Sequence, residues 1–265
     1  LNRHLEGIRD GKMVSYKQFS EIKLPLPSKQ EQEKIALFLT SVDTKIEQLI
    51  KKETLLTSYK KGVMQKIFNQ EIRFKADDGS EFCDWEEKKL GDLCKFQQGY
   101  QVPSSEQVKT KLDGYKRYLY ISDFFSDNNI TYVKYREGMN LMTKDDIAVA
   151  NTGNTAGSFY KGREGVLSNN MFFITILSKL TPEFLYVFLE SSKYEKQLNQ
   201  FFNSGGQPHL GHKNMSMIGI EYPCTEEQIK IANFLSSIDS KIEQVQKQLN
   251  LTKEFKKALL QQMFV

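Results

Sequence analysis

The chain has 265 residues, of which 39% are hydrophobic and 26% are charged, and its formal net charge is +4. These values fit a soluble globular protein of one or two domains. No apolar run approaches the roughly 18 residues that a membrane span needs, and no secretory signal pattern stands at the start, so we expect a cytoplasmic protein.

The charge distribution and the cysteines restrict the kinds of site that the chain can carry. Residues 71–220 hold 18 basic and 19 acidic side chains, so this part of the chain is not basic overall. It could bind a nucleic acid only through a local patch and contacts with bases. Cys83, Cys94 and Cys224 lack metal-ligand spacing, and we expect them to be buried reduced thiols.

Residues 1–27 resemble a later stretch of the same chain. Four residues recur 196 positions further on, in the pairs Lys17/Lys213, Ser20/Ser216, Ile22/Ile218 and Pro27/Pro223. The later stretch closes the central part of the chain. We therefore interpret residues 1–27 as the C-terminal remnant of a preceding domain of the same kind.

Residues 28–70 and 223–265 are two copies of one sequence. From Pro27 to Phe68 and from Pro223 to Phe264, roughly half of the positions match at the same offset and without a gap. Each copy begins with Pro, has Glu and Gln in its first turn and continues with good helix formers. This pattern predicts one long helix per copy.

Apolar residues recur at spacings of three and four along each copy, as in a coiled coil. The predicted seam consists of Ile35, Leu39, Val42, Ile46 and Leu49 in the first copy and of Ile231, Leu235, Ile238, Ile242 and Val245 in the second. Glu53 and Lys60 interrupt the pattern further along in the first copy, and Thr252 and Lys256 interrupt it in the second. Because a single helix cannot bury its own apolar stripe, we expect the two copies to pack against each other.

Residues 71–222 predict one mixed α/β domain, called the central domain below. Alternating or continuous apolar residues favour strands, and the expected strand regions are 93–103, 115–136 with a turn at 127–129, 145–151, 166–177 as a strand pair, and 217–222. Thr181 and Pro182 are typical of a helix start, so we expect a helix over 181–202. The stretches 151–157 and 204–211 are expected to be polar loops.

The arrangement resembles the specificity subunit of type I restriction-modification systems. The matching stretches are LPLPSKQEQEKIALFLTSVDTKIEQL with its second copy, DDIAVANTGNTAG, LSNNMFF and SGGQPHLGHK. The resemblance implies an α+β protein, with one target recognition domain flanked by two long helices that pack as an antiparallel coiled coil. It also implies that residues 1–27 end a preceding recognition domain.

The resemblance implies a function in DNA recognition. The central domain would read a half-site in double-stranded DNA, and the helices would dock methyltransferase subunits and, through them, restriction subunits. One complete recognition domain leaves the two-part site of the family unfilled, so a homodimer is expected for a half-length subunit. Lys45, Glu47, Lys241 and Glu243 lie off the seam, where they either dock the methyltransferase or only solubilise the helices.

Two other functions stay open. The chain could be a structural adaptor whose coiled coil joins protein partners without any DNA readout. It could also be an inhibitor that binds methyltransferase and blocks DNA methylation by titrating it.

Motifs for catalysis are missing from the sequence. All six prolines are isolated, so the Pro-Pro of an adenine methyltransferase loop is absent, and Gly11-Lys12 lacks the upstream glycine of a phosphate-binding loop because position 6 is Glu6. His209 and His212 lack further metal ligands, and Cys94 with His209 matches no nucleophile motif. We expect no catalytic residue, no metal and no cofactor.

Candidate DNA-contacting residues lie in polar loops. They are Gln97, Gln98 and Tyr100 in one loop, Asn151, Thr152, Asn154 and Thr155 in a second, and Gln207 and His209 with the following Lys213 in a third. Amide side chains can pair with adenine edges. For each loop the alternative is a tight or solvated turn without a ligand.

Six basic residues of the central domain are candidates for phosphate contacts. They are Lys116, Arg117, Lys134, Arg136, Lys161 and Arg163. The alternative for each is a solvated surface charge. Tyr118 and Tyr120 are expected in the core rather than stacked on bases.

Overall fold

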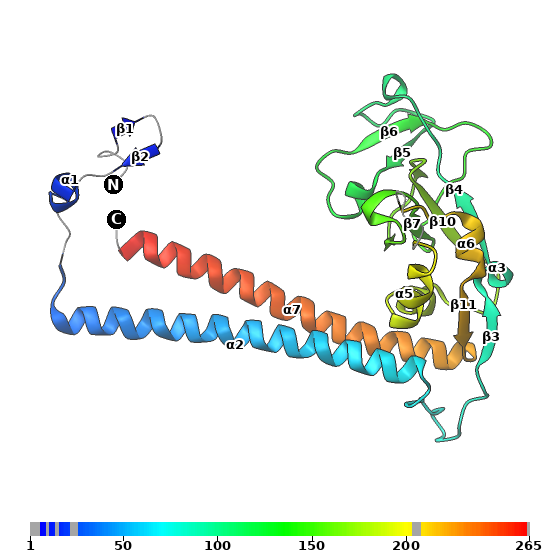
Figure 1. The fold of residues 1–265 in the computed structure, drawn as a ribbon, viewed down its shortest axis with the longest axis horizontal. Coiled ribbons are helices and arrows are strands. Elements are labelled where there is room, and N and C mark those ends of the chain that lie inside the picture. Colours follow the sequence, from blue (N-terminus) through cyan, green and yellow to red (C-terminus); the bar gives the residue numbers. More distant parts are fainter. Residues whose placement is uncertain (1–5, 9–10, 14–15, 22–25, 203–207, 264–265) are drawn as a thin grey trace. The chain divides into compact units, whose positions relative to one another are not determined.

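The computed structural model describes residues 6–8, 11–13, 16–21, 26–202 and 208–263 (Figure 1). The chain divides into two compact units. One consists of Leu1–Lys52 with Val245–Val265, and the other of Glu53–Gln244. Among the described residues, every helix is too short or too polar to span a lipid bilayer.

The two copies of the repeat form the two long helices, α2 (Lys29–Phe68) and α7 (Thr225–Met263), as predicted. Both helices start in the same way. The side-chain amide of Gln32 donates a hydrogen bond to the Pro27 carbonyl at 2.8 Å, and that of Gln228 donates one to the Pro223 carbonyl at 2.9 Å. α2 ends where Gln70 adopts a left-handed conformation (φ 58°), which stops a helix.

Two ion pairs join α2 to α7, one in each unit. Lys60 contacts Asp239 at 2.7 Å, and Lys256 pairs with Asp43. The second pair is the first one with its partners exchanged between the two copies of the repeat. The two lysines that interrupt the apolar pattern therefore connect the helices, and each unit contains an antiparallel pair of helical segments.

Burial of the predicted seam differs between the copies. Val42, Leu49, Ile231, Leu235, Ile238 and Val245 are buried, whereas Ile35, Leu39, Ile46 and Ile242 are half-buried. The start of α7 also packs on the central domain, because Ile231, Leu235 and Ile238 belong to its main hydrophobic cluster. The equivalent start of α2 is covered less.

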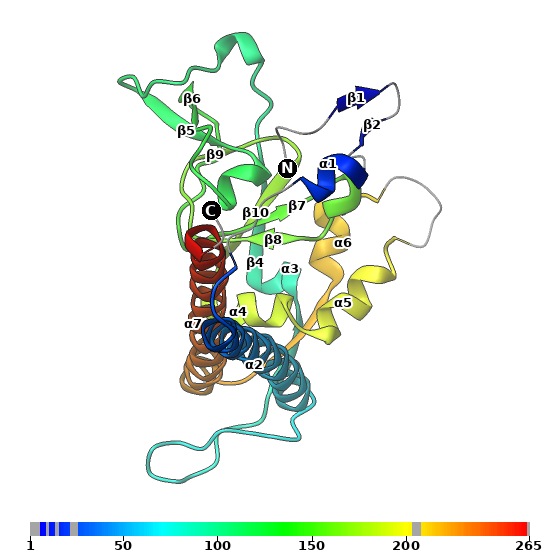
Figure 2. The same ribbon diagram turned by 90° about the vertical axis from the view of Figure 1, so that its left-hand side faces the viewer.

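The central domain contains three small sheets (Figures 1 and 2). The first orders its strands β4 (Cys94–Gln98), β10 (Met171–Ile176), β7 (Ile147–Ala150) and β8 (Phe159–Tyr160), all antiparallel. The second orders β6 (Thr131–Lys134), β5 (Tyr115–Leu119) and β9 (Val166–Leu167), and the third pairs β11 (Gly219–Tyr222) with β3 (Glu86–Lys89). In both views β5 and β6 lie on the opposite side of the four-stranded sheet from α5.

The remaining elements are short. They are β1 (Glu6–Ile8), β2 (Gly11–Met13), α1 (Tyr16–Ser20), α3 (Leu90–Leu93), α4 (Pro182–Leu189), α5 (Ser192–Asn199), α6 (His212–Met217) and three turns of 3-10 helix at Ser104–Glu106, Ile121–Phe124 and Gly153–Thr155. α1 and α6 start 196 residues apart, so the match between the two stretches extends to their local structure.

The four-stranded sheet is covered on both faces. Along β10, Phe172 and Ile174 face the main cluster, which includes α4, whereas Met171 and Phe173 face a second cluster with Leu119 from β5. This alternation follows from the two-residue period of a strand. Because both faces are buried, only the ends of the strands and the connecting loops are free for a ligand.

Several sequence expectations were wrong in detail. The helix over 181–202 is two helices, because Ser191 starts a new one by accepting a hydrogen bond from the Tyr194 N–H at 3.3 Å. The strands within 166–177 do not pair with each other, since β9 pairs with β5 and β10 with β4 and β7. Cys94 is buried, but Cys83 is exposed and Cys224 is half-buried.

His212 gives the fold a pH dependence. Its ring packs 4.9 Å from the Phe172 ring, its Nε2 is buried without a hydrogen-bond partner, and burial lowers its pKa. The folded protein therefore binds this proton less readily than the unfolded chain, and stability is lost as the pH falls below the ordinary histidine pKa. We expect His212→Phe to reduce the fall in melting temperature between about pH 7.5 and 5.5. The exposed His209→Gln serves as the control, and equal pH profiles for His212→Phe and the wild type would contradict this account.

Lys60 and Lys256 provide a matched test of the helix pairing. Burial alone would lower the pKa of Lys60, but hydrogen bonds to Asp239 and Glu190 outweigh it and raise the pKa. Lys256 has only Asp43 as an ion-pair partner in the described part of the chain. We expect Lys60→Met to cost about 1–3 kcal/mol of unfolding free energy in urea titrations, and Lys256→Met to cost less. Equal losses would refute the extra contribution of Glu190.

Candidate nucleic-acid interface

Three loops meet at one end of the four-stranded sheet. β4 and β7 end there and β10 begins there, since Gln98 lies opposite Phe172 and Ala150 lies opposite Met171. The loop after β4, the turn before β10 and the loop after β7 are therefore neighbours. Residues from separate parts of the sequence come together at this end of the sheet, which we call the polar edge.

A network of amide groups holds this edge, here called the amide framework: Gln98, Asn140, Asn151 and the backbone of Asn169. The Asn169 carbonyl accepts hydrogen bonds from the Gln98 side chain at 2.7 Å and from the Asn151 side chain at 3.3 Å. The Asn140 side chain donates to the Gln98 carbonyl at 3.2 Å. Asn151 is buried, and its Oδ1 has no hydrogen-bond partner among the residues that the structure describes. Gln98 and Asn151, both predicted to contact DNA, thus support the loop instead of projecting from it.

The turn before β10 presents two free amides that the sequence analysis missed. Asn169 and Asn170 are exposed, and their side chains form no hydrogen bond within the described part of the chain. Their backbone is fixed, because the Asn151 N–H donates to the Asn170 carbonyl at 3.0 Å. Two adjacent Asn residues immediately before a buried strand were the available signal.

The loop after β7 lies beside the chain at 208–210. Thr152 and His209 form an isolated antiparallel bridge, and the Gly153 N–H donates to the Pro208 carbonyl at 3.0 Å. Asn154 and Thr155 are exposed in a turn of 3-10 helix, and His209 is exposed beside them. These predicted residues are brought together. Gln207 lies outside the described residues.

The loop after β4 completes the edge. Tyr100 is exposed, and its N–H donates to the Leu167 carbonyl at 2.7 Å. A Cβ at Gly99 would lie 2.0 Å from the Ser168 carbonyl oxygen, so this close approach requires glycine. Gln97 is used internally, because its side chain donates to the Thr175 hydroxyl at 3.0 Å.

Carboxylates neutralise half of the predicted phosphate-binding residues. Arg117 pairs with Asp123 and Asp127, both at 2.8 Å, and Arg163 also reaches Asp127 at 2.9 Å. Hydrogen bonds from the two guanidinium groups lower the pKa of Asp127. In the same way Arg136 pairs with Glu106.

The predicted lysines differ in their surroundings. Lys116 on β5, Lys134 on β6 and Lys213 on α6 are exposed and form no ion pair within the described residues. Lys161 instead lies over the Tyr186 ring, 4.0 Å from its centroid, in a cavity that also contains Glu183. The first three are therefore free to meet phosphates, whereas Lys161, although exposed, lies against the Tyr186 ring.

The edge carries side chains that suit the reading of bases. It combines free Asn amides, Thr, Tyr and His side chains on a backbone fixed by hydrogen bonds, which are the groups that recognise base edges. Within the described ranges, no three His, Cys, Asp or Glu side chains gather as metal ligands.

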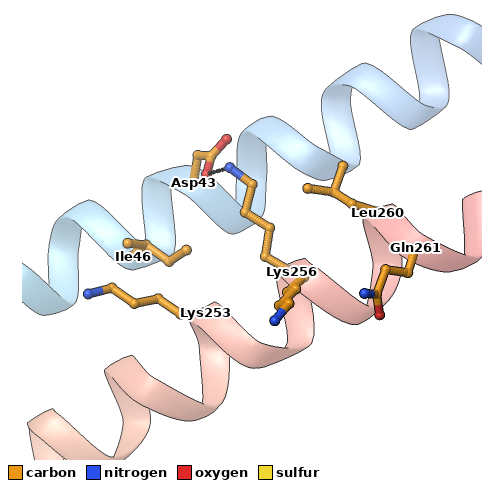
Figure 3. Close-up of a pocket in the computed structure, with 7 residues that line it drawn as sticks. Asp43, Ile46, Lys253, Lys256, Leu260 and Gln261 are labelled. Carbon is orange, nitrogen blue, oxygen red and sulfur yellow. Dashed lines mark hydrogen bonds and ion pairs between the residues drawn. The ribbon is translucent and has the colours of Figure 1, made fainter. Parts of the chain in front are cut away.

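A second feature lies between the helices in the unit of Leu1–Lys52 and Val245–Val265. We call it the open groove. It is a cavity of about 630 Å³ (Figure 3), and its lining residues are Asp43, Ile46, Lys253, Lys256, Lys257, Leu260 and Gln261. The repeat places Thr57, Lys60, Lys61, Met64 and Gln65 at the positions of its α7 residues. These five line a cavity in the other unit, which Glu190, Ser192 and Glu195 from the α4–α5 corner close.

Exposed apolar residues recur at equivalent positions of the two helices. Leu55 is 60% exposed and its counterpart Leu251 is 56% exposed. One turn later, Tyr59 and its counterpart Phe255 are 53% and 51% exposed. Lys45, Glu47, Lys241 and Glu243 are exposed as well. Each helix thus has apolar side chains that the described part of the chain leaves exposed.

A family model described as "type I restriction modification DNA specificity domain" matches residues 8–57 and 83–253. The chain belongs to this family. The match takes in α7 up to residue 253, much of α2 and almost all of the central domain. It therefore includes the polar edge and the predicted seam residues of both helices, whereas Lys60 and Lys256 lie outside the matched ranges.

Similar proteins agree with this family. The type I restriction enzyme MjaVIII specificity subunit of Methanocaldococcus jannaschii is 29% identical over 184 residues, covering 68% of this chain and 42% of that protein. The putative MjaX specificity subunit of the same organism is 26% identical over 262 residues, covering 93% and 59%. The chain thus spans about half the length of these curated relatives.

A solved structure shares the fold. The crystal structure of the S subunit of a type I restriction-modification system from M. genitalium gives a TM-score of 0.61 at 19% identity, covering 96% of this chain and 66% of that chain. The expected α+β architecture, with a mixed domain between two long helices, is confirmed.

Proposed function

We propose that this chain reads DNA sequence for a type I restriction-modification complex, using the polar edge of its central domain. The family match and the free amides of Asn169 and Asn170 carry this proposal. Together with Asn154, Thr155 and His209 they present donors and acceptors on one edge. Lys116, Lys134 and Lys213 supply contacts with phosphates.

The readout is of low intrinsic affinity. Residues 71–220 hold 18 basic and 19 acidic side chains, and three of the arginines are paired with carboxylates, so the overall attraction to DNA phosphates is weak. Affinity therefore depends on partner subunits that hold the DNA, and the chain contributes discrimination between sequences. Methyl transfer and cleavage reside on those partners.

The helices dock methyltransferase subunits. The support is the recurrence of the exposed pairs Leu55 with Tyr59 and Leu251 with Phe255, since apolar faces left uncovered at equivalent positions suit two copies of one partner. Polar replacement of all four residues should abolish capture of the methyltransferase while leaving the fold intact.

Residues 1–27 are the end of another recognition domain, and that domain packs on the open groove. The support is the match of α1 with α6, together with the correspondence between the open groove and the cavity that Glu190 and Glu195 close. Lys253, Lys256 and Lys257 would meet acidic residues of that domain. A second copy of this chain could supply the other half-site instead by forming a homodimer.

The test is selection from a pool of random DNA duplexes by the purified complex of this chain with its methyltransferase subunit. We expect one enriched half-site, which is lost when Asn169 and Asn170 are both replaced by alanine. Enrichment without any motif would overturn the proposal. Binding of methyltransferase with no effect of DNA would identify an adaptor, and loss of methylation on adding the chain would identify an inhibitor.

A further inference from the structure

Two cysteines flank the pair of strands β3 and β11. In the antiparallel pair of β3 and β11, Glu86 lies opposite Tyr222. Cys83 stands three residues before Glu86, and Cys224 two residues after Tyr222. Neither cysteine belongs to a strand, because β3 begins at Glu86 and β11 ends at Tyr222, so both lie at the same end of this antiparallel pair.

Both cysteines line the same small cavity. Its volume is about 230 Å³, and its other walls include Glu86, Lys179 and Tyr222. Burial raises the pKa of Cys224, and an interaction with the Cys83 side chain raises it further. The two thiols are therefore close enough to interact, and both are free.

The backbone on each side is fixed. The Arg73 guanidinium donates to the Cys83 carbonyl at 2.6 Å and to the Glu227 carboxylate at 2.7 Å. Glu227 is buried in the first turn of α7, and the Gln228 N–H donates to the Cys224 carbonyl at 3.0 Å. One arginine thus ties the segment of Cys83 to the helix turn that follows Cys224.

We propose that Cys83 and Cys224 form a redox-active thiol pair, which a low-molecular-weight disulfide such as oxidised glutathione converts to an intramolecular disulfide. The bond would join the segment entering the central domain to the start of α7. It would close a covalent loop around the whole of that domain. Neither the family nor the DNA readout requires this chemistry.

The reaction balances as two thiol–disulfide exchanges. The exposed Cys83 loses its proton and attacks one sulfur of oxidised glutathione, which forms a mixed disulfide and releases one glutathione thiolate. Cys224 then loses its proton and attacks the Cys83 sulfur, which releases the second glutathione. The two cysteines lose two electrons, the oxidant gains them, and the two protons end on the two glutathione molecules.

The third cysteine is an internal control. Cys94 is buried in β4, and burial raises its pKa to about 12. A thiol that is neither accessible nor ionised does not exchange. Cys94 is therefore expected to stay reduced under the same conditions.

The experiment treats the purified full chain with oxidised glutathione and maps the proteolytic peptides by mass spectrometry without reduction. We expect a peptide linking Cys83 to Cys224, reversed by dithiothreitol, and an unmodified Cys94. Because the bond constrains the unfolded chain, the melting temperature should rise by about 5 °C or more.

Three serine variants separate the possible outcomes. Cys94→Ser should still form the link. Cys224→Ser should stop at glutathione on Cys83, and Cys83→Ser should remain largely unmodified. A wild-type chain that keeps glutathione on Cys83 without closing, or that forms dimers through Cys83 as its main product, would overturn the proposal. DNA selection by the complex is a separate readout, so its failure would leave this test unaffected.

Discussion

Replacing Leu235 by alanine is expected to lower the unfolding free energy by about 2–5 kcal/mol, the usual cost of truncating a buried leucine. Leu235 is fully buried on α7 in the main cluster, where Phe184 and Phe188 of α4 also pack. The side chain therefore belongs to the helix pair and to the central domain at once.

Leu39 is the matched control, because it is the same residue at the equivalent position of the repeat and is only half-buried. Leu39→Ala should cost distinctly less. Urea titrations of both variants give the comparison. Equal costs would mean that the central domain does not stabilise the start of α7 in the way described.

The second large effect concerns specificity. Replacing Asn169 and Asn170 together by alanine should reduce discrimination between the preferred and a mismatched site by about 10- to 100-fold, because each bidentate amide contact contributes roughly 1–3 kcal/mol. The fold should be unaffected, since both side chains are exposed and form no hydrogen bond within the described part of the chain. The measurement is the ratio of methylation rates on the two duplexes by the complex.

Asn128→Ala is the control for this variant. Asn128 is an exposed amide in the connection between β5 and β6, outside the loops after β4 and β7 and the turn before β10. It should leave the ratio unchanged. A double variant that keeps full discrimination would remove Asn169 and Asn170 from the readout.

Local patterns were enough to predict the long helices, because an apolar spacing of three and four persists over each copy of the repeat. The same spacing could not distinguish Leu235 from Leu39. Their burial differs because only the start of α7 meets α4 and the rest of the central domain. That contact is non-local, and no local periodicity encodes it.

The polar edge shows the corresponding limit for a site. The sequence placed Tyr100 and Asn154 in polar loops, as found, but the prediction of a loop at Gln97 and Gln98 was wrong because both belong to β4. It could not show that Gln98 and Asn151 bond to the Asn169 backbone, because this depends on the register of β4 against β10. The amides that face solvent, Asn169 and Asn170, were therefore overlooked.

The pairing of lysines with carboxylates across the helices was equally hidden. In the sequence, Lys60 and Lys256 only interrupt the apolar pattern of the seam. In the structure each finds the aspartate of the other copy, Asp239 or Asp43. An internal repeat thus fixes interactions that a single helix sequence leaves undefined.

The most direct measurement is the map of methylated bases in the DNA of cells that carry this chain with its methyltransferase subunit. The account predicts methylation at one discrete motif, which widens or shifts when Asn169 and Asn170 are replaced. Methylation that is scattered without a motif, or that keeps the same motif when this chain is deleted, would contradict a role in reading DNA.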